Sequence, residues 1–446
     1  MDMKFTGLEE CGIMEALPEP MKGIFLPDGI FYWSDRAAKE AEINATIGSA
    51  KGKASHFLPG GGDSIKTFYL PSIIDALKGL NSEQVVSYAK IAGMPNFRQA
   101  WRKWVVQKLE KHYKFDENLL GLPIVLPGAT AGITYLARFF LSPGDSIICH
   151  DRHWENYDLI YEGCQGLKVE TVPLFNGNGM EIEALAEKVV ELGARQKCVA
   201  AVLNFPNNPT GYMPTVKEGK ALRDALVAAA NKSDARIVLI FDDAYEGYVY
   251  EDDAAPVSIF GDFIGAHPGI IPVKCDGATK EFLIYGGRVA AVTFAAHPQW
   301  GDVKRIHSEI ENKMKALIRG SISNCNRATQ EAVALALGNM DVVSAERKKI
   351  VDVLAERYRI LKQELGGTDM PGCSTDPFNA GFFCSLNVPV PAEELSDRLL
   401  KKYKVGTIPM NIERLGINSI RIAFCSVEAD TIGEMVSRIS DCIRTF

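Results

Sequence analysis

The sequence predicts an α/β fold in which a mostly parallel sheet lies between helices. The first observation is a series of short apolar runs, rich in Val, Ile and Leu, with the length and composition of buried strands. These runs alternate with segments whose apolar residues have helical spacing, as in parallel strands joined by helices. The chain has 446 residues, which is enough for two domains that share a large buried core.

The N-terminal part of the chain carries few of these signals. Residues up to about Pro59 are predicted to be irregular, with a turn at Ile47–Ala50. Gly60–Gly62 should form a flexible break after them. The apolar residues of Phe97–Val106 then recur at helical spacing and predict a helix.

Five buried strands are expected in the middle of the chain, because each is a short apolar run rich in β-branched residues. They are Ile124–Leu126, Ser146–Cys149, Val169–Val172, Val199–Leu203 and Ile237–Phe241.

A long helical region near Val303–Leu337 is predicted to lead out of this sheet. A further helix, starting near Val343, should end at Gly366–Gly367, and Ala380–Leu386 and Ile420–Phe424 have the pattern of strands. We therefore predict a large domain at residues 61–325 and a smaller α+β domain at residues 326–446.

Composition excludes several classes of function. The formal net charge of −7 leaves no basic surface for nucleic acid. Ten cysteines occur without a Cys-x-x-Cys pair, which favours buried thiols over a disulfide framework. The N-terminus lacks a signal-peptide core, and no apolar run approaches the ~20 residues of a membrane helix. A cytoplasmic protein without membrane contact is predicted.

Polar residues of a particular chemistry follow the predicted strands. Asp242–Tyr245 comes directly after the strand Ile237–Phe241, where open α/β sheets bind their ligands. Asn208–Gly211 lies upstream, and Lys280 is followed eight positions later by Arg288. This order indicates an enzyme that carries pyridoxal phosphate (PLP) as a Schiff base on a lysine.

Each of these residue types has a task in PLP chemistry. Lys280 would form the imine and later move a proton. Asp242 would pair with the protonated pyridine nitrogen, which makes the ring an electron sink. Tyr245 and Asn208 could hydrogen-bond the phenolic oxygen, and Arg288 would bind the phosphate with its fork of donors. A lone lysine is usually solvated, so the prediction depends on the whole set.

Over nearly its whole length the chain resembles the aspartate and aromatic aminotransferases, which are PLP enzymes of fold type I. Asn208–Gly211 resembles the family's Asn-Pro-x-Gly turn, and Asp242–Tyr245 its Asp-x-Ala-Tyr strand end. The resemblance implies a seven-stranded, mostly parallel sheet in the large domain. It also implies that the N-terminal segment, residues 1–60, packs with the small domain.

The small-residue stretch after Ile124–Leu126 is similar to the family's phosphate loop. The resemblance implies that Gly128, Ala129 and Thr130 hold the phosphate with backbone N–H groups and a hydroxyl at a helix N-terminus. The chain departs from the pattern at Gly277, where many relatives have a phosphate-binding serine. Thr279 could supply that hydroxyl instead.

The resemblance also implies further contacts. Trp154 should stack on the pyridine ring, Tyr88 should reach the phosphate of a neighbouring subunit, and Arg421 should bind the substrate α-carboxylate. Trp154, Asn208 and Gly48 are also expected at the substrate. Arg319 resembles the arginine that binds a side-chain carboxylate across a dimer interface, although an exposed helical arginine is an alternative interpretation.

The sequence therefore predicts a homodimeric, metal-free transaminase with shared active sites. It would move an amino group between an amino acid and a 2-oxo acid by ping-pong kinetics. Arg319 favours aspartate and glutamate, and relatives that keep this arginine also accept aromatic amino acids. A PLP lyase or decarboxylase on the same fold is the alternative. A regulator's ligand-sensing domain and a PLP-free relative are weaker alternatives, the first because the N-terminus has no room for a DNA-binding segment.

Overall fold

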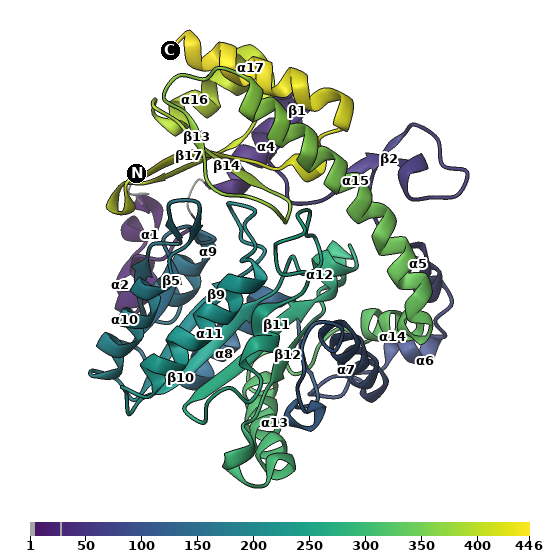
Figure 1. Cartoon of the computed structure of the whole chain (residues 1–446), viewed down its shortest axis with the longest axis vertical. Helices are drawn as coiled ribbons and strands as arrows, with labels where there is room; N and C mark the ends of the chain where they lie inside the picture. The colour runs from purple at the N-terminus through teal and green to yellow at the C-terminus, as the bar shows by residue number, and fades with distance from the viewer. Residues whose placement is uncertain (1–4, 27–28) are drawn as a thin grey trace.

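A computed structural model of the chain describes residues 5–26 and 29–446. Residues 1–4 and 27–28, which belong to the predicted N-terminal segment, lie outside it. Figure 1 shows a large α/β part and, at the other end of the molecule, a smaller part that carries α16 (Ala392–Arg398) and α17 (Ile432–Arg444). The long helix α15 (Met340–Gly367) runs between the two parts.

The large part is built on one seven-stranded sheet, with the strand order β4-β12-β11-β10-β9-β5-β6. Five neighbouring strands run parallel, and β12 is antiparallel to both of its neighbours. The strand bounds are β4 Ile124–Leu126, β5 Ser146–His150, β6 Lys168–Val172, β9 Cys198–Asn204, β10 Arg236–Asp242, β11 Ile270–Gly277 and β12 Ala290–Phe294. The predicted fold class is confirmed.

Helices cover both faces of this sheet, each face with its own apolar core. On one face lie α7 (Pro95–Leu109), α10 (Glu183–Gly193) and α11 (Val216–Ala230). On the other lie α8 (Ala129–Phe140) and α13 (Val303–Arg319). The start of α11 follows from its sequence, because Thr215 and Glu218 form a capping box.

The small part has a four-stranded antiparallel sheet with the order β13-β14-β17-β16. Its strands are β13 Ser374–Thr375, β14 Cys384–Asn387, β16 Ile408–Ile412 and β17 Ile417–Ile422. The sheet packs on α15, α16 and α17 around a separate core. Of these strands β14 and β17 overlap the predicted ones, whereas β16 was not predicted.

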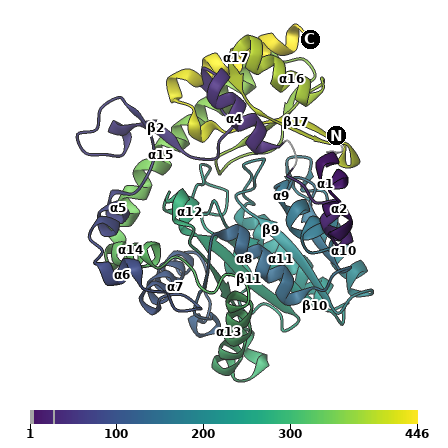
Figure 2. The same cartoon turned by 180° about the vertical axis from the view of Figure 1, so that it is seen from behind.

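The prediction that residues up to Pro59 are irregular was wrong. Its described residues, 5–26 and 29–59, form four α-helices, one 3-10 turn and two short strands: α1 Thr6–Glu10, α2 Ile13–Ala16, α3 Glu19–Lys22, α4 Ile30–Glu40, η1 Ala54–His56, β1 Ile43–Asn44 and β2 Lys51–Lys53. Strand β1 pairs in parallel with β15 (Val405–Gly406), and Figure 2 shows α4 lying against the small part. These short elements depend on tertiary contacts, which explains their weak sequence signals.

Two further predictions were corrected. The helical region predicted at residues 303–337 is divided into α13 and α14 (Arg327–Ala336), because the chain leaves helical geometry between Gly320 and Asn326. Gly60–Gly62 belongs to the hydrogen-bonded connection between β2 and its antiparallel partner β3 (Ile65–Thr67). Within residues 5–26 and 29–446, no helix is long and apolar enough to cross a membrane.

Candidate active site

A cavity of about 370 Å³ opens where the carboxyl ends of β9, β10 and β11 meet. Parallel strands place the residues that follow them at one edge, so this is the expected position for a ligand. Eleven of the predicted site residues line the cavity: Gly48, Ala129, Thr130, Trp154, Asn208, Asp242, Tyr245, Thr279, Lys280, Arg288 and Arg421.

Asp242 ends β10, and one of its carboxylate oxygens is already used. The hydroxyl of Tyr157 donates to Oδ2 at 2.6 Å, whereas Oδ1 is buried and has no hydrogen-bond partner among the described residues. Burial raises the pKa of Asp242, and hydrogen bonds from Tyr157 and the Ala244 backbone oppose that rise. An unpaired carboxylate oxygen at a cavity wall matches what a protonated pyridine nitrogen needs.

Lys280 lies in α12 (Ala278–Glu281), one short step beyond the end of β11. Its Nζ donates to the carbonyl of Gly48 at 2.8 Å and lies 4.9 Å from the centre of the Tyr285 ring. Burial, with a further contribution from Arg421 and Arg288, lowers the pKa of Lys280 to about 8. More of this amine is therefore neutral and nucleophilic near physiological pH than in an ordinary lysine.

The phosphate end of the cavity is formed by the start of α8 and by Arg288. Gly128 precedes α8 with φ +96°, and a Cβ there would lie only 2.2 Å from Nη2 of Arg288. The guanidinium of Arg288 donates to the Tyr285 carbonyl at 3.3 Å and lies 3.5 Å from the Thr279 hydroxyl. Helix N–H groups, a guanidinium and a hydroxyl around a space kept open by glycine fit a phosphate group.

Arg421, on β17, closes the opposite end of the cavity and is only 4% exposed. It donates to Asn208 Oδ1 at 3.1 Å and to the Thr46 carbonyl at 2.9 Å, and its Cζ lies 4.4 Å from the ring centre of Phe383. Because Asn208 uses Oδ1 for this contact, its Nδ2 is the atom that can donate to a phenolic oxygen.

Two smaller features shape the middle of the cavity. A Cβ on Gly48 would lie 2.8 Å from Cζ of Phe383, so a larger residue there would displace that ring. Trp154 meets the ring of Tyr157 edge-on, with 5.8 Å between centres.

Two predicted residues lie away from the cavity of a single chain. Tyr88 is 87% exposed. Arg319 is the last residue of α13, is exposed, and donates to the Ser323 hydroxyl at the same surface. The roles predicted for both require a second copy of the chain.

Sequence reasoning missed several residues of the site. Tyr157 holds Asp242, Tyr285 flanks Lys280, and Phe383 packs on Arg421. Asn204 links the Asn208 backbone to the Asp242 carbonyl, at 2.9 Å on each side. Only Asn204 had a usable signal, because it directly follows the predicted strand Val199–Leu203.

Comparison with known proteins agrees with this geometry. A family model described as aminotransferase class I and II matches residues 62–439. The chain is 25% identical to an LL-diaminopimelate aminotransferase of Maridesulfovibrio salexigens and 25% identical to an aspartate aminotransferase of Pyrococcus horikoshii; each match covers 84% of this chain and 87% of the relative. Among solved structures, an aminotransferase of Anaerococcus prevotii superimposes with a TM-score of 0.80 at 24% identity, covering 95% of this chain and 98% of that one.

Proposed function

The chain belongs to the class I and II aminotransferases and is a PLP-dependent enzyme, and we propose that it moves an amino group from aspartate or glutamate to a 2-oxo acid. The observation that carries the proposal is the single cavity at the ends of β9, β10 and β11. Lys280, the unpaired oxygen of Asp242 and the guanidinium of Arg421 all line it.

The residues around the cavity would divide the work of holding PLP. When bound, PLP withdraws electrons from the substrate Cα and so acidifies its proton. Asp242 would accept the pyridine N–H through Oδ1 while Tyr157 holds Oδ2 in place. Tyr245 and Nδ2 of Asn208 would donate to the phenolic oxygen. The phosphate would bind to Arg288, to Thr279 and to Gly128, Ala129 and Thr130 at the start of α8.

Two basic groups would act on the amino acid itself. Lys280, with a pKa of about 8, can take the Cα proton and return it at another carbon, as a general acid–base catalyst requires. Arg421 would bind the α-carboxylate with its fork of donors. Its contacts with Asn208 and the Thr46 carbonyl fix the guanidinium plane before a substrate arrives.

The charges around the cavity support a shared active site for dicarboxylates. Within the described part of one chain, the cationic side chains that line the cavity are Lys280, Arg288 and Arg421, and each has a task on PLP or the α-carboxylate. A substrate's second carboxylate would therefore need a cation from elsewhere. Arg319, exposed at the end of α13, could supply it from the second subunit of a homodimer.

The thiols bear on the cellular location. All ten cysteines are unpaired in the structure, and Cys149, Cys275, Cys384 and Cys425 are among the buried ones. Unpaired thiols are typical of a reducing compartment, which supports a cytoplasmic location.

The proposal is tested by mixing purified, PLP-loaded protein with single amino acids and recording absorption spectra. We expect the band of lysine-bound PLP to fall and the band of pyridoxamine phosphate to rise, at the lowest concentrations with aspartate and glutamate. A response to aromatic amino acids alone would remove the dicarboxylate role of Arg319. Bound PLP with no spectral change would favour a lyase or decarboxylase, which product analysis without an added 2-oxo acid would identify.

A further inference from the structure

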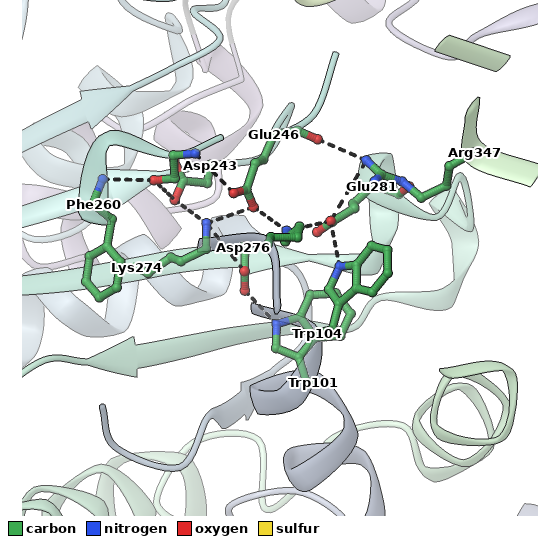
Figure 3. Close-up of polar contacts among 11 residues, drawn as sticks. Trp101, Trp104, Asp243, Glu246, Phe260, Lys274, Asp276, Glu281 and Arg347 are labelled. Atoms are coloured by element: carbon green, nitrogen blue, oxygen red, sulfur yellow. Dashed lines mark hydrogen bonds and ion pairs between the residues drawn. The ribbon is translucent and has the colours of Figure 1, made fainter. Parts of the chain in front are cut away.

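Figure 3 shows a network of buried ionic side chains whose carboxylates are chain neighbours of residues that line the candidate active site. We call it the ion network. It joins four carboxylates to two ammonium groups: Asp243, Glu246, Asp276 and Glu281 with Lys108 and Lys274. The four carboxylates and Lys274 are all buried.

Lys274, on β11, is the centre of the ion network. Its Nζ lies 2.5 Å from Asp243 Oδ2, 2.9 Å from Glu246 Oε2 and 3.5 Å from Asp276 Oδ2. Lys108, on α7, extends the network, with 2.5 Å to Glu246 and 2.6 Å to Glu281. Each cation thus joins residues of two different segments.

The indole groups of α7 donate hydrogen bonds to two of these carboxylates. Trp101 Nε1 donates to Asp276 Oδ1 at 2.8 Å, and Trp104 Nε1 donates to Glu281 Oε1 at 2.8 Å. Glu246, Asp276 and Glu281 are close enough together to hold a metal ion, but Lys108 and Lys274 already serve as their counter-ions.

Every carboxylate of the ion network is the chain neighbour of a residue that lines the cavity. The four pairs are Asp242 with Asp243, Tyr245 with Glu246, Gly277 with Asp276, and Lys280 with Glu281. Asp242 ends β10 and lines the cavity, whereas Asp243, the next residue, pairs with Lys274 and accepts a hydrogen bond from the Ser258 hydroxyl. Any displacement of the network therefore moves the active-site segments with it.

Helix α15 is attached to the same place. Arg347 donates to the backbone carbonyl of Glu281 at 2.9 Å and to that of Glu246 at 3.2 Å. It therefore holds the backbone next to Lys280 and next to Tyr245 with one guanidinium. Because α15 continues into the small part, which carries Arg421, this contact links the small part to the chain segment that carries Lys280.

Stability alone does not explain such a network. Removing charges from water is costly, and well-packed apolar residues often stabilise a core equally well. Unlike apolar contacts, ion pairs are directional, because each one fixes two charged groups at a particular distance and angle. Here those groups belong to the two segments that must hold PLP and the reacting amine in register.

We propose that the ion network, centred on Lys274 and bonded to α15 through Arg347, fixes the position of Lys280 relative to Asp242 and Tyr245. This position would allow Lys280 to transfer the substrate proton. This inference rests on the proposed transaminase function. Lys274 and Arg347 act as positioning residues, since neither lines the cavity.

Two variants test the inference, one at the buried centre of the ion network and one at its partly exposed edge. Lys274→Met combined with Asp243→Asn removes one ammonium group together with the carboxylate that it pairs with, so neither partner of this ion pair is left alone in the buried centre. Arg347→Gln removes the contact at the partly exposed edge. The matched control is Arg359→Gln, an exposed arginine on the same helix.

For each variant we would measure kcat, KM, thermal unfolding and the pH midpoint of the lysine-bound PLP absorption band. We expect bound PLP, a KM within about threefold of the starting protein, and a kcat that is ten- to a hundredfold lower, roughly the effect of a 1 Å misplacement. The band midpoint should also shift, because it reports the surroundings of Lys280. The control should change none of these.

A lower unfolding temperature with unchanged kcat and band midpoint would reduce the network to a structural role and overturn the inference. If the double variant does not fold, Arg347→Gln decides alone, and an unchanged kcat and midpoint in it would refute the inference. Absence of a lysine-bound PLP band in the starting protein would instead refute the proposed function.

Discussion

A single buried carboxylate shows how the site is prepared for its cofactor. In the proposed function Asp242 must stay ionised to hold a proton on the pyridine nitrogen, yet burial raises its pKa. The Tyr157 hydroxyl, 2.6 Å from Oδ2, stabilises the ionised form and fixes which oxygen faces the cavity. Tyr157 should therefore contribute to PLP chemistry without touching the substrate.

Tyr157→Phe tests this contribution. A hydrogen bond to a charged group contributes about 1.5–3 kcal/mol, so we expect PLP affinity and kcat to fall by roughly ten- to a hundredfold. The matched control is Tyr161→Phe, because the buried Tyr161 hydroxyl has no partner among the described residues. That variant should keep activity and be equally or more stable. Equal losses in both variants, measured by PLP titration and steady-state kinetics, would contradict the role of Tyr157.

The lowered pKa of Lys280 predicts how the apoprotein takes up PLP. Only the neutral amine attacks the aldehyde, so the attachment rate should rise with pH and reach half its maximum near pH 8, instead of near the ordinary lysine pKa of 10.5. The folded apoprotein loses this proton more readily than the unfolded chain. Lys280 should therefore add stability as pH rises from about 8 to 10.5. Stopped-flow absorption measures the rate, and a midpoint near 10.5 would contradict the burial argument.

At the scale of elements, the start of α8 is the part of the proposed phosphate site that depends most on one residue. Gly128 has a positive φ, and its missing side chain leaves room for the Arg288 guanidinium. A residue larger than glycine would meet two obstacles, backbone strain and a clash with the arginine. The effect of backbone strain can be separated from the effect of the clash by comparison with a second glycine that has a similar φ but no neighbour to clash with.

Gly128→Ala and Gly144→Ala form that comparison. Both glycines have φ above +90°, but a Cβ on Gly144 meets nothing within 4 Å. Both variants should lose on the order of 1–3 kcal/mol of unfolding free energy from backbone strain. Only Gly128→Ala should also weaken PLP binding, by tenfold or more, because it displaces Arg288. PLP titration alongside thermal unfolding measures both effects, and equal PLP affinities would contradict the phosphate assignment.

The strands show where sequence reasoning succeeds and where it fails. The five predicted strands overlap β4, β5, β6, β9 and β10, because central parallel strands are apolar on both faces. Strand β11 was missed because Lys274 and Asp276 interrupt its apolar run. Those two residues belong to the ion network, and their burial becomes evident only when partners from β10 and α7 are in place.

The same contrast holds for the site. Eleven predicted residues line the cavity: those such as Asp242 were predicted from motifs that follow strands, whereas Gly48 and Arg421 were predicted only from the family resemblance. Tyr157, Tyr285 and Phe383 could not, because each reaches its partner through a tertiary contact that no local spacing records.

At the scale of the whole molecule, the cavity depends on both parts of the chain. Arg421 of the small part donates to Asn208 of the large part, and Lys280 donates to the Gly48 carbonyl of the N-terminal segment. Arg152 and Asp376 add an ion pair across the same boundary at 3.1 Å. Arg421, proposed to bind the substrate carboxylate, and Lys280, proposed to form the imine, thus lie more than 100 residues apart in the chain. The remaining part of the proposed site, Arg319, would come from a second chain.

Mixed dimers test whether active sites are shared. Lys280→Ala abolishes lysine-bound PLP, and Arg319→Gln should lower kcat/KM for aspartate by roughly ten- to a hundredfold through loss of one charge-assisted pair. In a heterodimer of the two variants, one site carries both defects. The other combines the intact Lys280 of one chain with the intact Arg319 of its partner.

Co-expression with two different affinity tags allows that heterodimer to be isolated. It should recover about half of the starting activity with aspartate, since one of its two sites is complete. If Arg319 acted on its own chain's cavity, both sites of the heterodimer would be defective and activity would stay low. If Arg319 had no role, Arg319→Gln alone would already be active with aspartate. Recovery in the heterodimer, beside low activity in each parent variant, therefore requires a guanidinium that crosses from one subunit into the cavity of the other.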